Sequence, residues 1–331
     1  MRHFRVLLLA VLVVGLSSWG FLVHRTSTQL AIYQLPNEMQ PFFYDQLDYL
    51  VRYSVRPDQR RNSDKSEGPK HFIDAERFGP GGLAAMPRDW NAAVAKYGED
   101  SLFHNGYVPY WVINQKAKLT EAFRSGNRDS ILFYAADLAH YVGDANVPLH
   151  TTENHDGQLT GQKGMHSLWE SAIPEIELAS YNLYEDHKAT YLAKPDETIW
   201  KAVREANALL PQMFAMEKEV SKDFTDSTKY RVQMRNGRES RSYSSAFARA
   251  YSAKLAPSIN QQLLKTGHMI ADFWYTAWVD AGKPKLEGLL KEPVSAQGAS
   301  AWAQELISYK TNQLLKNKML RAREKQEGSG D

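Results

Sequence analysis

The chain has 331 residues, 43% of them hydrophobic, and this length and composition can bury a large core. The absence of cysteine excludes a disulfide framework and thiolate metal ligands. Because 40 lysines and arginines face 38 aspartates and glutamates, overall charge gives no basis for inferring a nucleic-acid partner.

The first segment, residues 1–18, has the order of a secretory signal peptide. Two arginines and a histidine precede an apolar run from Val6 to Leu16, and the small residues Ser17 and Ser18 follow it. The run is too short to span a bilayer. We therefore expect cleavage after Ser18, a mature chain that begins at Trp19, and a secreted or periplasmic location. Cleavage removes two of the 40 basic residues and leaves 38 against 38 acidic ones.

Beyond this segment, apolar residues recur at helical spacing and no convincing strand alternation appears. The expected helices cover roughly residues 24–35, 39–55, 88–97, 107–125, 128–145, 164–182, 196–221, 244–281 and 299–323. Breaks are expected at Pro57, at the Gly79–Gly82 turn, in the Gly157–Gly164 loop and in a basic stretch from Ser221 to Ser242. That stretch could meet a polyanion, but such runs are usually solvated loops. We predict an all-α fold, a single compact multi-helix domain over residues 19–323, with a disordered tail at residues 324–331.

The predicted helix over residues 128–145 places two potential metal ligands on one face. Its apolar stripe faces the core, whereas His140 and Asp144 lie one turn apart on the opposite, polar face. Asp137 precedes His140 by a turn and either accepts its free imidazole N–H or is an ordinary solvated aspartate. Pro148 ends the helix soon after Asp144, so that His150 follows from a loop.

A second pair, His166 and Glu170, repeats the same four-residue spacing after the Gly157–Gly164 loop. Imidazole nitrogen and carboxylate oxygen are the ligands that catalytic zinc accepts. One such pair is usually a surface pair or a satisfied core histidine. Two pairs, with His150 between them, favour a metal-dependent hydrolase.

A wider series of residues resembles one superfamily. The series comprises Trp19-Gly20, His24, Asp58, His71-Phe72-Ile73-Asp74, His140, Asp144, Pro148-Leu149-His150, His166 and Glu170. It resembles the trinuclear zinc phosphodiesterases, which include single-strand-specific nucleases of the S-one/P-one type and bacterial zinc-dependent phospholipases C. The resemblance runs from Trp19 to about Ile173, and the region after about residue 185 adds helices but no motif of this superfamily.

The resemblance implies three zinc ions per chain. One would be held by Asp58, His71, His140 and Asp144, and a second by His150, His166 and Glu170. The third would be held by the amino group and carbonyl oxygen of Trp19, by His24 and by a bridging Asp144. The resemblance also implies a zinc-bound hydroxide as nucleophile, Asp58 as the group that orients or deprotonates water, and Arg61 as the brace for the phosphoryl oxygens.

Three features favour a nuclease: the short spacing from Trp19 to His24, Arg61 beside Asp58, and the pair Phe72 and Asp74. In the nucleases resembled, the phenylalanine stacks on a base and the aspartate hydrogen-bonds its edge. Against them, Glu170 stands where these nucleases usually have aspartate and the phospholipases have glutamate. The cysteines of the fungal and plant nucleases are also missing.

We therefore predict a zinc-dependent endonuclease that hydrolyses single-stranded DNA or RNA, with removal of 3′-phosphates from nucleotides as a further activity. Two alternatives stay open: a phospholipase C acting on phosphatidylcholine-like lipids, and a non-catalytic zinc-binding helical protein. No obligate protein partner is evident from the sequence.

Overall fold

The structure is a computed structural model that describes residues 20–235, 238–255 and 258–323. The predicted signal peptide (1–18), Trp19 and the predicted tail (324–331) lie outside the described residues.

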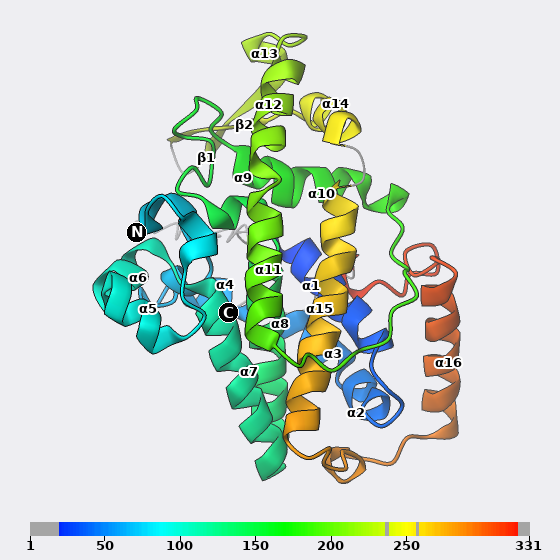
Figure 1. The fold of residues 1–331 in the computed structure, drawn as a ribbon. Helices are drawn as coiled ribbons and strands as arrows, with labels where there is room; N and C mark the ends of the chain where they lie inside the picture. The colour runs from blue at the N-terminus through cyan, green and yellow to red at the C-terminus, as the bar shows by residue number, and fades with distance from the viewer. Residues whose placement is uncertain (1–19, 236–237, 256–257, 324–331) are drawn as a thin grey trace, which may run out of the picture.

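Helices make up most of the described chain (Figure 1). In the first half they are α1 (Phe21–Tyr33), α2 (Gln40–Asp45), α3 (Leu47–Tyr53), α4 (Arg56–Arg60), α5 (Trp90–Tyr97), α6 (Glu99–Asn105), α7 (Val108–Ser125) and α8 (Arg128–Asp144). The second half contains α9 (Met165–Ser167), α10 (Ile173–Glu177), α11 (Pro195–Asn207), α12 (Leu210–Ser221), α13 (Asp226–Lys229), α14 (Ser245–Leu255), α15 (Ser258–Asp280) and α16 (Ala296–Lys310).

Short helical turns fill several connections. The 3-10 turns are η1 (Gly68–Lys70), η2 (Ala75–Phe78), η3 (Gly82–Ala85), η4 (Pro148–Thr151), η6 (Leu178–Ser180), η7 (Glu287–Leu289) and η8 (Arg321–Arg323). The segment η5 (Leu168–Ala172) is π-helical. Among the described residues no helix is both long and apolar enough to cross a membrane.

The helices α7 and α8 form the scaffold that carries the site. They are joined by a tight turn in which Gly126 has a φ of 62° and the Asn127 side chain caps α8 by accepting from the Ser130 N–H. The long helix α15 packs against both, and Trp274 Nε1 donates to the Ala135 carbonyl at 3.0 Å. These contacts hold the apolar face of α8 against the core and fix the position of its polar face.

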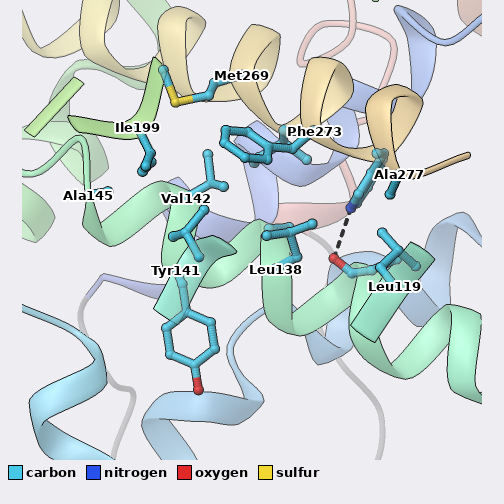
Figure 2. Close-up of a cluster of buried hydrophobic side chains, with 14 of the residues drawn as sticks. Leu119, Leu138, Tyr141, Val142, Ala145, Ile199, Met269, Phe273 and Ala277 are labelled. Atoms are coloured by element: carbon cyan, nitrogen blue, oxygen red, sulfur yellow. Dashed lines mark hydrogen bonds between the residues drawn. The ribbon is translucent and has the colours of Figure 1, made fainter. Parts of the chain in front are cut away.

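The main core lies between α8 and α15. Figure 2 shows Leu138 and Val142 of α8 facing Phe273 of α15, with all three side chains buried. Tyr141 belongs to the same cluster but points its hydroxyl away from the apolar side chains, toward Glu67. One helix therefore supplies the core with one face and the site with another, as its periodicity predicts.

A second apolar cluster joins the segment η5–α10 to α12, α14 and the root of a hairpin. Trp169, Met213 and Phe247 are its buried members from three of these elements. In Figure 1 this part stands above the main helix stack, whereas α16 packs along the side of α1 and α2. The all-α prediction of a single compact multi-helix domain is confirmed.

Several predicted helices are interrupted, and a proline explains one of the breaks. The expected helix over 196–221 divides into α11 and α12, with Pro211 in the first turn of the second. Over the range 244–281 the structure describes α14 and α15, and residues 256–257 between them lie outside the described part of the chain. Proline lacks a backbone N–H and disfavours helical geometry in the residue before it.

The expected helix over 164–182 contains the π-helical turn η5. The Ile173 N–H bonds to the Leu168 carbonyl five residues earlier, and Pro174 has no N–H to offer the Glu170 carbonyl. Such π turns occur frequently at functional sites. Here the turn carries Glu170, one of the predicted ligands.

The prediction of a solvated loop from Ser221 to Ser242 is wrong. After α13, the strands β1 (Tyr230–Arg235) and β2 (Arg238–Tyr243) pair antiparallel. The sequence signal is Asn236-Gly237, the dipeptide typical of two-residue hairpin connections. These strands form the one sheet of the described part of the chain.

The central position of Phe273 gives a stability prediction. Phe273→Ala should lower the free energy of unfolding by about 3–5 kcal/mol, because it opens a cavity between α8 and α15. Ile307→Ala, at a 62% exposed position of α16, should change it by no more than about 0.5 kcal/mol. Denaturant unfolding measures both, and equal effects would contradict the assignment of this core.

Candidate metal centre

The structure brings together every predicted metal ligand that it describes. They come from separate elements and lie within one connected set of groups: His24 (α1), Asp58 (α4), His71 (after η1), His140 and Asp144 (α8), His150 (η4), His166 (α9) and Glu170 (η5). The ninth predicted ligand, Trp19, lies outside the described residues.

Asp144 lies at the centre of the set and is 1% exposed. Its Oδ2 is 2.9 Å from His71 Nδ1 and 3.3 Å from His140 Nε2. Its Oδ1 is 3.5 Å from His24 Nε2. Asp58 completes the first group, with Oδ1 3.7 Å from His71 Nδ1. The two oxygens of one carboxylate thus face two different sets of nitrogen atoms.

The second group consists of His150, His166 and Glu170. His150 Nε2 lies 3.2 Å from His166 Nε2, which is 2.7 Å from Glu170 Oε2. The polar atoms of these three side chains lie within 4.8 Å of one another. They are close enough together to share one cation.

The third group forms where α1 begins. His24, Asp144 and Glu170 offer ligand atoms within 4.8 Å of one another. A Cβ added to Gly20 would lie 3.0 Å from Glu170 Oε1, so the first described residue of the chain reaches this group. A Cβ added to Gly143 would lie 2.7 Å from His24 Nδ1, so glycine gives His24 its place beside α8.

Backbone carbonyls set the orientation of two of the imidazoles. His140 Nδ1 lies 2.8 Å from the Ser54 carbonyl, and His150 Nδ1 lies 2.7 Å from the His71 carbonyl. A carbonyl only accepts, so each Nδ1 carries the proton and each Nε2 presents its lone pair to the cluster. Fixing the tautomer in this way is typical of metal-binding histidines.

The hypothesis that Asp137 accepts from His140 is wrong, as is the alternative that Asp137 is solvated. Asp137 is 2% exposed and is held by Arg56 at 2.6 Å and by Arg60 at 2.7 Å. The guanidinium groups of Arg56 and Arg60, both on α4, pair with the Asp137 carboxylate. The His140 imidazole donates to the Ser54 carbonyl instead.

Glu67 contacts His71 on the side away from the cluster, and the sequence analysis did not identify this residue. This 1% exposed carboxylate accepts from Tyr141, from Arg60 at 3.1 Å and from Lys70 at 2.8 Å. Its Oε1 lies 3.6 Å from His71 Nε2, on the side away from the cluster. The available signal was the spacing of Glu67 and His71, which is the same four residues as in the two ligand pairs.

Burial and neighbouring charge perturb the pKa values throughout the cluster. Burial by itself would raise the pKa of Asp144, but the surrounding imidazoles hold it well below its usual range. Burial lowers the pKa of His150 to about 4. Burial would also lower the pKa of His71, but Asp144, Glu67 and Asp58 raise it to about 9. The Asp144 carboxylate therefore stabilises the protonated, positively charged form of the neighbouring His71.

Two hollows open over the cluster. The larger, of about 660 Å³, is lined by Gly20, Asp58, Arg61 and several of the ligands. The guanidinium of Arg61 is 49% exposed at its mouth, with Nη1 3.5 Å from Asp58 Oδ1. The cluster is therefore accessible to a substrate on one side.

The smaller hollow, of about 210 Å³, is lined by Phe72, Asp74, Arg61, His71, Leu149, His150, His155 and His166. It joins the two residues predicted to bind a base to three predicted metal ligands, His71, His150 and His166. His155 lines it as well. His155 precedes the Gly157–Gly164 loop in the sequence, and only the fold brings it to the hollow that Phe72 lines.

Comparison with known families agrees with this geometry. The S1/P1 Nuclease family model matches residues 19–277. The chain belongs to the S1/P1 nuclease family. None of the curated proteins gives a significant match. As a member of this family, the chain is in general terms a zinc-dependent nuclease that acts on nucleic acid.

The residues of this S1/P1 nuclease fit zinc. The donors are imidazole nitrogens and carboxylate oxygens, the ligand types that zinc accepts. The His71 Nδ1 and His140 Nε2 atoms approach to 3.1 Å although the His140 lone pair points into the gap. A cation among these atoms would satisfy the lone pairs and the Asp144 charge together.

The close approach of Gly143 to His24 gives a prediction about metal content. Gly143→Ala should displace His24 and lower the zinc content of the purified protein, with a loss of stability of about 1–3 kcal/mol from overpacking. Gly288→Ala, where a Cβ meets nothing within 4 Å, is the matched control. Elemental analysis and thermal unfolding measure both variants. An unchanged zinc content in Gly143→Ala would remove His24 from the ligand set.

Proposed function

We propose that this S1/P1 nuclease is an exported enzyme that hydrolyses phosphodiester bonds of single-stranded DNA and RNA at three zinc ions, and that it also removes 3′-phosphates from nucleotides. The observation that carries the proposal is the opening of the ligand cluster into the hollow lined by Phe72 and Asp74. The same hollow is lined by predicted metal ligands and by an aromatic ring able to stack on a base.

The assignment of three ions rests on the way the ligands divide. His71 and His140 face Asp144 Oδ2, Asp58 lies beside His71, and His24 faces Asp144 Oδ1. The set formed by His150, His166 and Glu170 lies beside them. Trp19 is one peptide before Gly20, and consecutive Cα atoms are about 3.8 Å apart. This spacing supports Trp19 as a ligand with His24.

When bound, zinc supplies Lewis acidity toward the phosphoryl oxygens and acidifies water near neutral pH. The protein residues orient the reactants. Burial, followed by repulsion from Asp144, raises the pKa of Asp58, so this carboxylate is suited to orient the attacking water and to take its proton. Arg61 at the mouth presents a planar pair of donors to the non-bridging phosphoryl oxygens.

Phe72 and Asp74 are placed to select an unstacked base. The half-buried ring of Phe72 lines the smaller hollow, and a base in a duplex cannot present its face to such a ring. Burial, together with Glu76 and Glu153, raises the pKa of Asp74 to about 6. Above that pH the carboxylate accepts hydrogen bonds from a base edge, and below it the protonated form also donates.

Export is proposed from the order of residues 1–18, which the structure does not describe. The family match begins at Trp19, the residue expected after cleavage, and this agrees with removal of the segment before it. A mature terminus at Trp19 is also what the third zinc site requires.

The proposed substrate gives the main functional prediction. The mature protein should cleave single-stranded DNA and RNA and leave phosphatidylcholine intact. Phe72→Ala should lower kcat/KM on single strands about tenfold or more, because stacking contributes about 1–3 kcal/mol per base. Activity on a nitrophenyl phosphodiester and zinc content should stay near wild type, since neither depends on a stacked base.

Phe103→Ala is the matched control, because Phe103 is a 41% exposed phenylalanine outside both hollows over the cluster. Equal losses of Phe72→Ala on both substrates would assign Phe72 to the core. Hydrolysis of phosphatidylcholine without cleavage of nucleic acid would replace the nuclease with the phospholipase C alternative.

The proposed Trp19 ligand depends on a free amino group. A protein that begins Met-Trp19 converts this amine to an amide, a poor zinc ligand, and should lose the third zinc and most activity while the other two sites stay filled. The control is the same protein trimmed to begin at Trp19. Mass spectrometry, elemental analysis and activity measure the pair, and full activity of the extended form would refute ligation through the terminus.

A further inference from the structure

The two hollows over the metal centre differ in size. The smaller, which Phe72 lines, has a volume of about 210 Å³, whereas the larger has about 660 Å³. Sites that enclose a small organic molecule in proteins measure about 300–1,000 Å³. The smaller hollow falls below this range and suits a base alone, whereas the larger hollow has room for a whole nucleoside.

The two hollows meet at one wall. Arg61, His150 and His166 line both of them, and the Nε2 atoms of the two histidines are 3.2 Å apart. The histidines are predicted metal ligands, and Arg61 is the predicted brace of the phosphoryl oxygens. The phosphorus that reacts must therefore lie at this shared wall. A phosphodiester joins two nucleosides, and each hollow can hold one side of it.

The larger hollow also contains polar side chains that have no task in the metal centre. Asn62, Ser167 and Ser171 line it, and none of the three is a predicted ligand. Their side chains make no hydrogen bond to another residue of the described chain. Asn62 and Ser167 are exposed, whereas Ser171 is 5% exposed. A polar group that entered the hollow would give each of them a partner.

The same three residues are placed beside groups of the predicted centre. Asn62 directly follows Arg61, Ser167 follows His166, and Ser171 follows Glu170. Ser167 ends α9 and Ser171 lies in the π-helical turn η5, so both come from the segment that carries two ligands. A substrate group that touched these side chains would lie next to the reacting phosphate.

The proposed reactions determine which part of a strand enters the larger hollow. If one base site serves both cleavage and removal of 3′-phosphates, the base in the smaller hollow belongs to the nucleoside whose 3′ oxygen carries the phosphate. Water attacks phosphorus, the bond to the 3′ oxygen breaks, and that oxygen leaves with a proton. The phosphate stays on the 5′ oxygen of the next nucleoside, here called the downstream nucleoside. The remaining opening at the shared wall is the larger hollow.

We propose that the larger hollow binds the downstream nucleoside of the substrate, through Asn62, Ser167 and Ser171. Amide and hydroxyl groups both donate and accept, so they can contact sugar hydroxyls and phosphate oxygens without reading the base. This inference rests on the proposed function, because it requires a nucleic-acid substrate. The site then binds the two nucleosides that flank the cleaved bond, and a diester without a downstream nucleoside lacks half of the contacts.

The test compares two substrates that share the base and the broken bond. One is the thymidine dinucleotide, and the other is thymidine 3′-methylphosphate, in which a methyl group replaces the downstream nucleoside. The variant N62A/S167A/S171A should lower kcat/KM on the dinucleotide about tenfold or more, because up to three hydrogen bonds are lost. Its kcat/KM on the methyl ester and its zinc content should stay near wild type.

Two further variants separate the hollow from the fold. Ser167→Phe places a large ring at an exposed position of the larger hollow and should also lower dinucleotide cleavage alone. N91A/S245A/S300A removes one amide and two hydroxyls at exposed positions outside both hollows and should leave both substrates unaffected. Circular dichroism and thermal unfolding verify that each variant is folded.

The outcomes distinguish this inference from the proposed function. If the wild type cleaves neither diester nor a long single strand, the proposed function fails. If the wild type cleaves both diesters and the triple alanine variant and Ser167→Phe keep full dinucleotide activity, only the present inference is overturned. Equal losses on the two substrates, accompanied by loss of zinc, would also overturn it, because these side chains would then support the metal centre.

Discussion

The site depends on one buried carboxylate. Asp144 is 1% exposed on α8, and a charge so far from water is stable only with compensating charge and hydrogen bonds around it. His71, His140 and His24 approach its two oxygens from three other positions along the chain. The packing of α1, α4 and α8 brings the partners of this carboxylate together. A metal ion bound there would stabilise the fold as well as serve catalysis.

Rigid backbone positions the ligands around that carboxylate. The Ser54 and His71 carbonyls fix two imidazoles, and the π-helical turn before Pro174 carries Glu170 toward His166. Glu67 forms ion pairs with Arg60 and Lys70 and contacts His71 on the side away from the cluster. These groups do not touch substrate, yet they determine the direction of each donor atom. Metal sites need this outer support for affinity and geometry.

The charges of the chain nearly cancel in sum but not in space. Carboxylates gather at the metal centre, whereas the cationic side chain of Arg61 lies at its mouth. A polyanionic substrate would meet this guanidinium before it reached the ligands. The family assignment covers residues 19–277 and therefore includes all the ligands.

By itself the sequence determined the all-α class, the ligand types and their short spacings, since helical periodicity and four-residue pairs are local properties. It also identified the superfamily, through motifs that stand close together in the chain. Only the tertiary structure decided which groups pair with each other. Asp137 forms ion pairs with Arg56 and Arg60, and His140 forms a hydrogen bond with the Ser54 carbonyl. The contact of Glu67 with His71 and the place of His155 beside Phe72 likewise needed the fold. Hydrogen-bond and ion-pair partners of this kind depend on packing between distant segments. Local spacing carries no information about which of several polar groups lies close enough to pair.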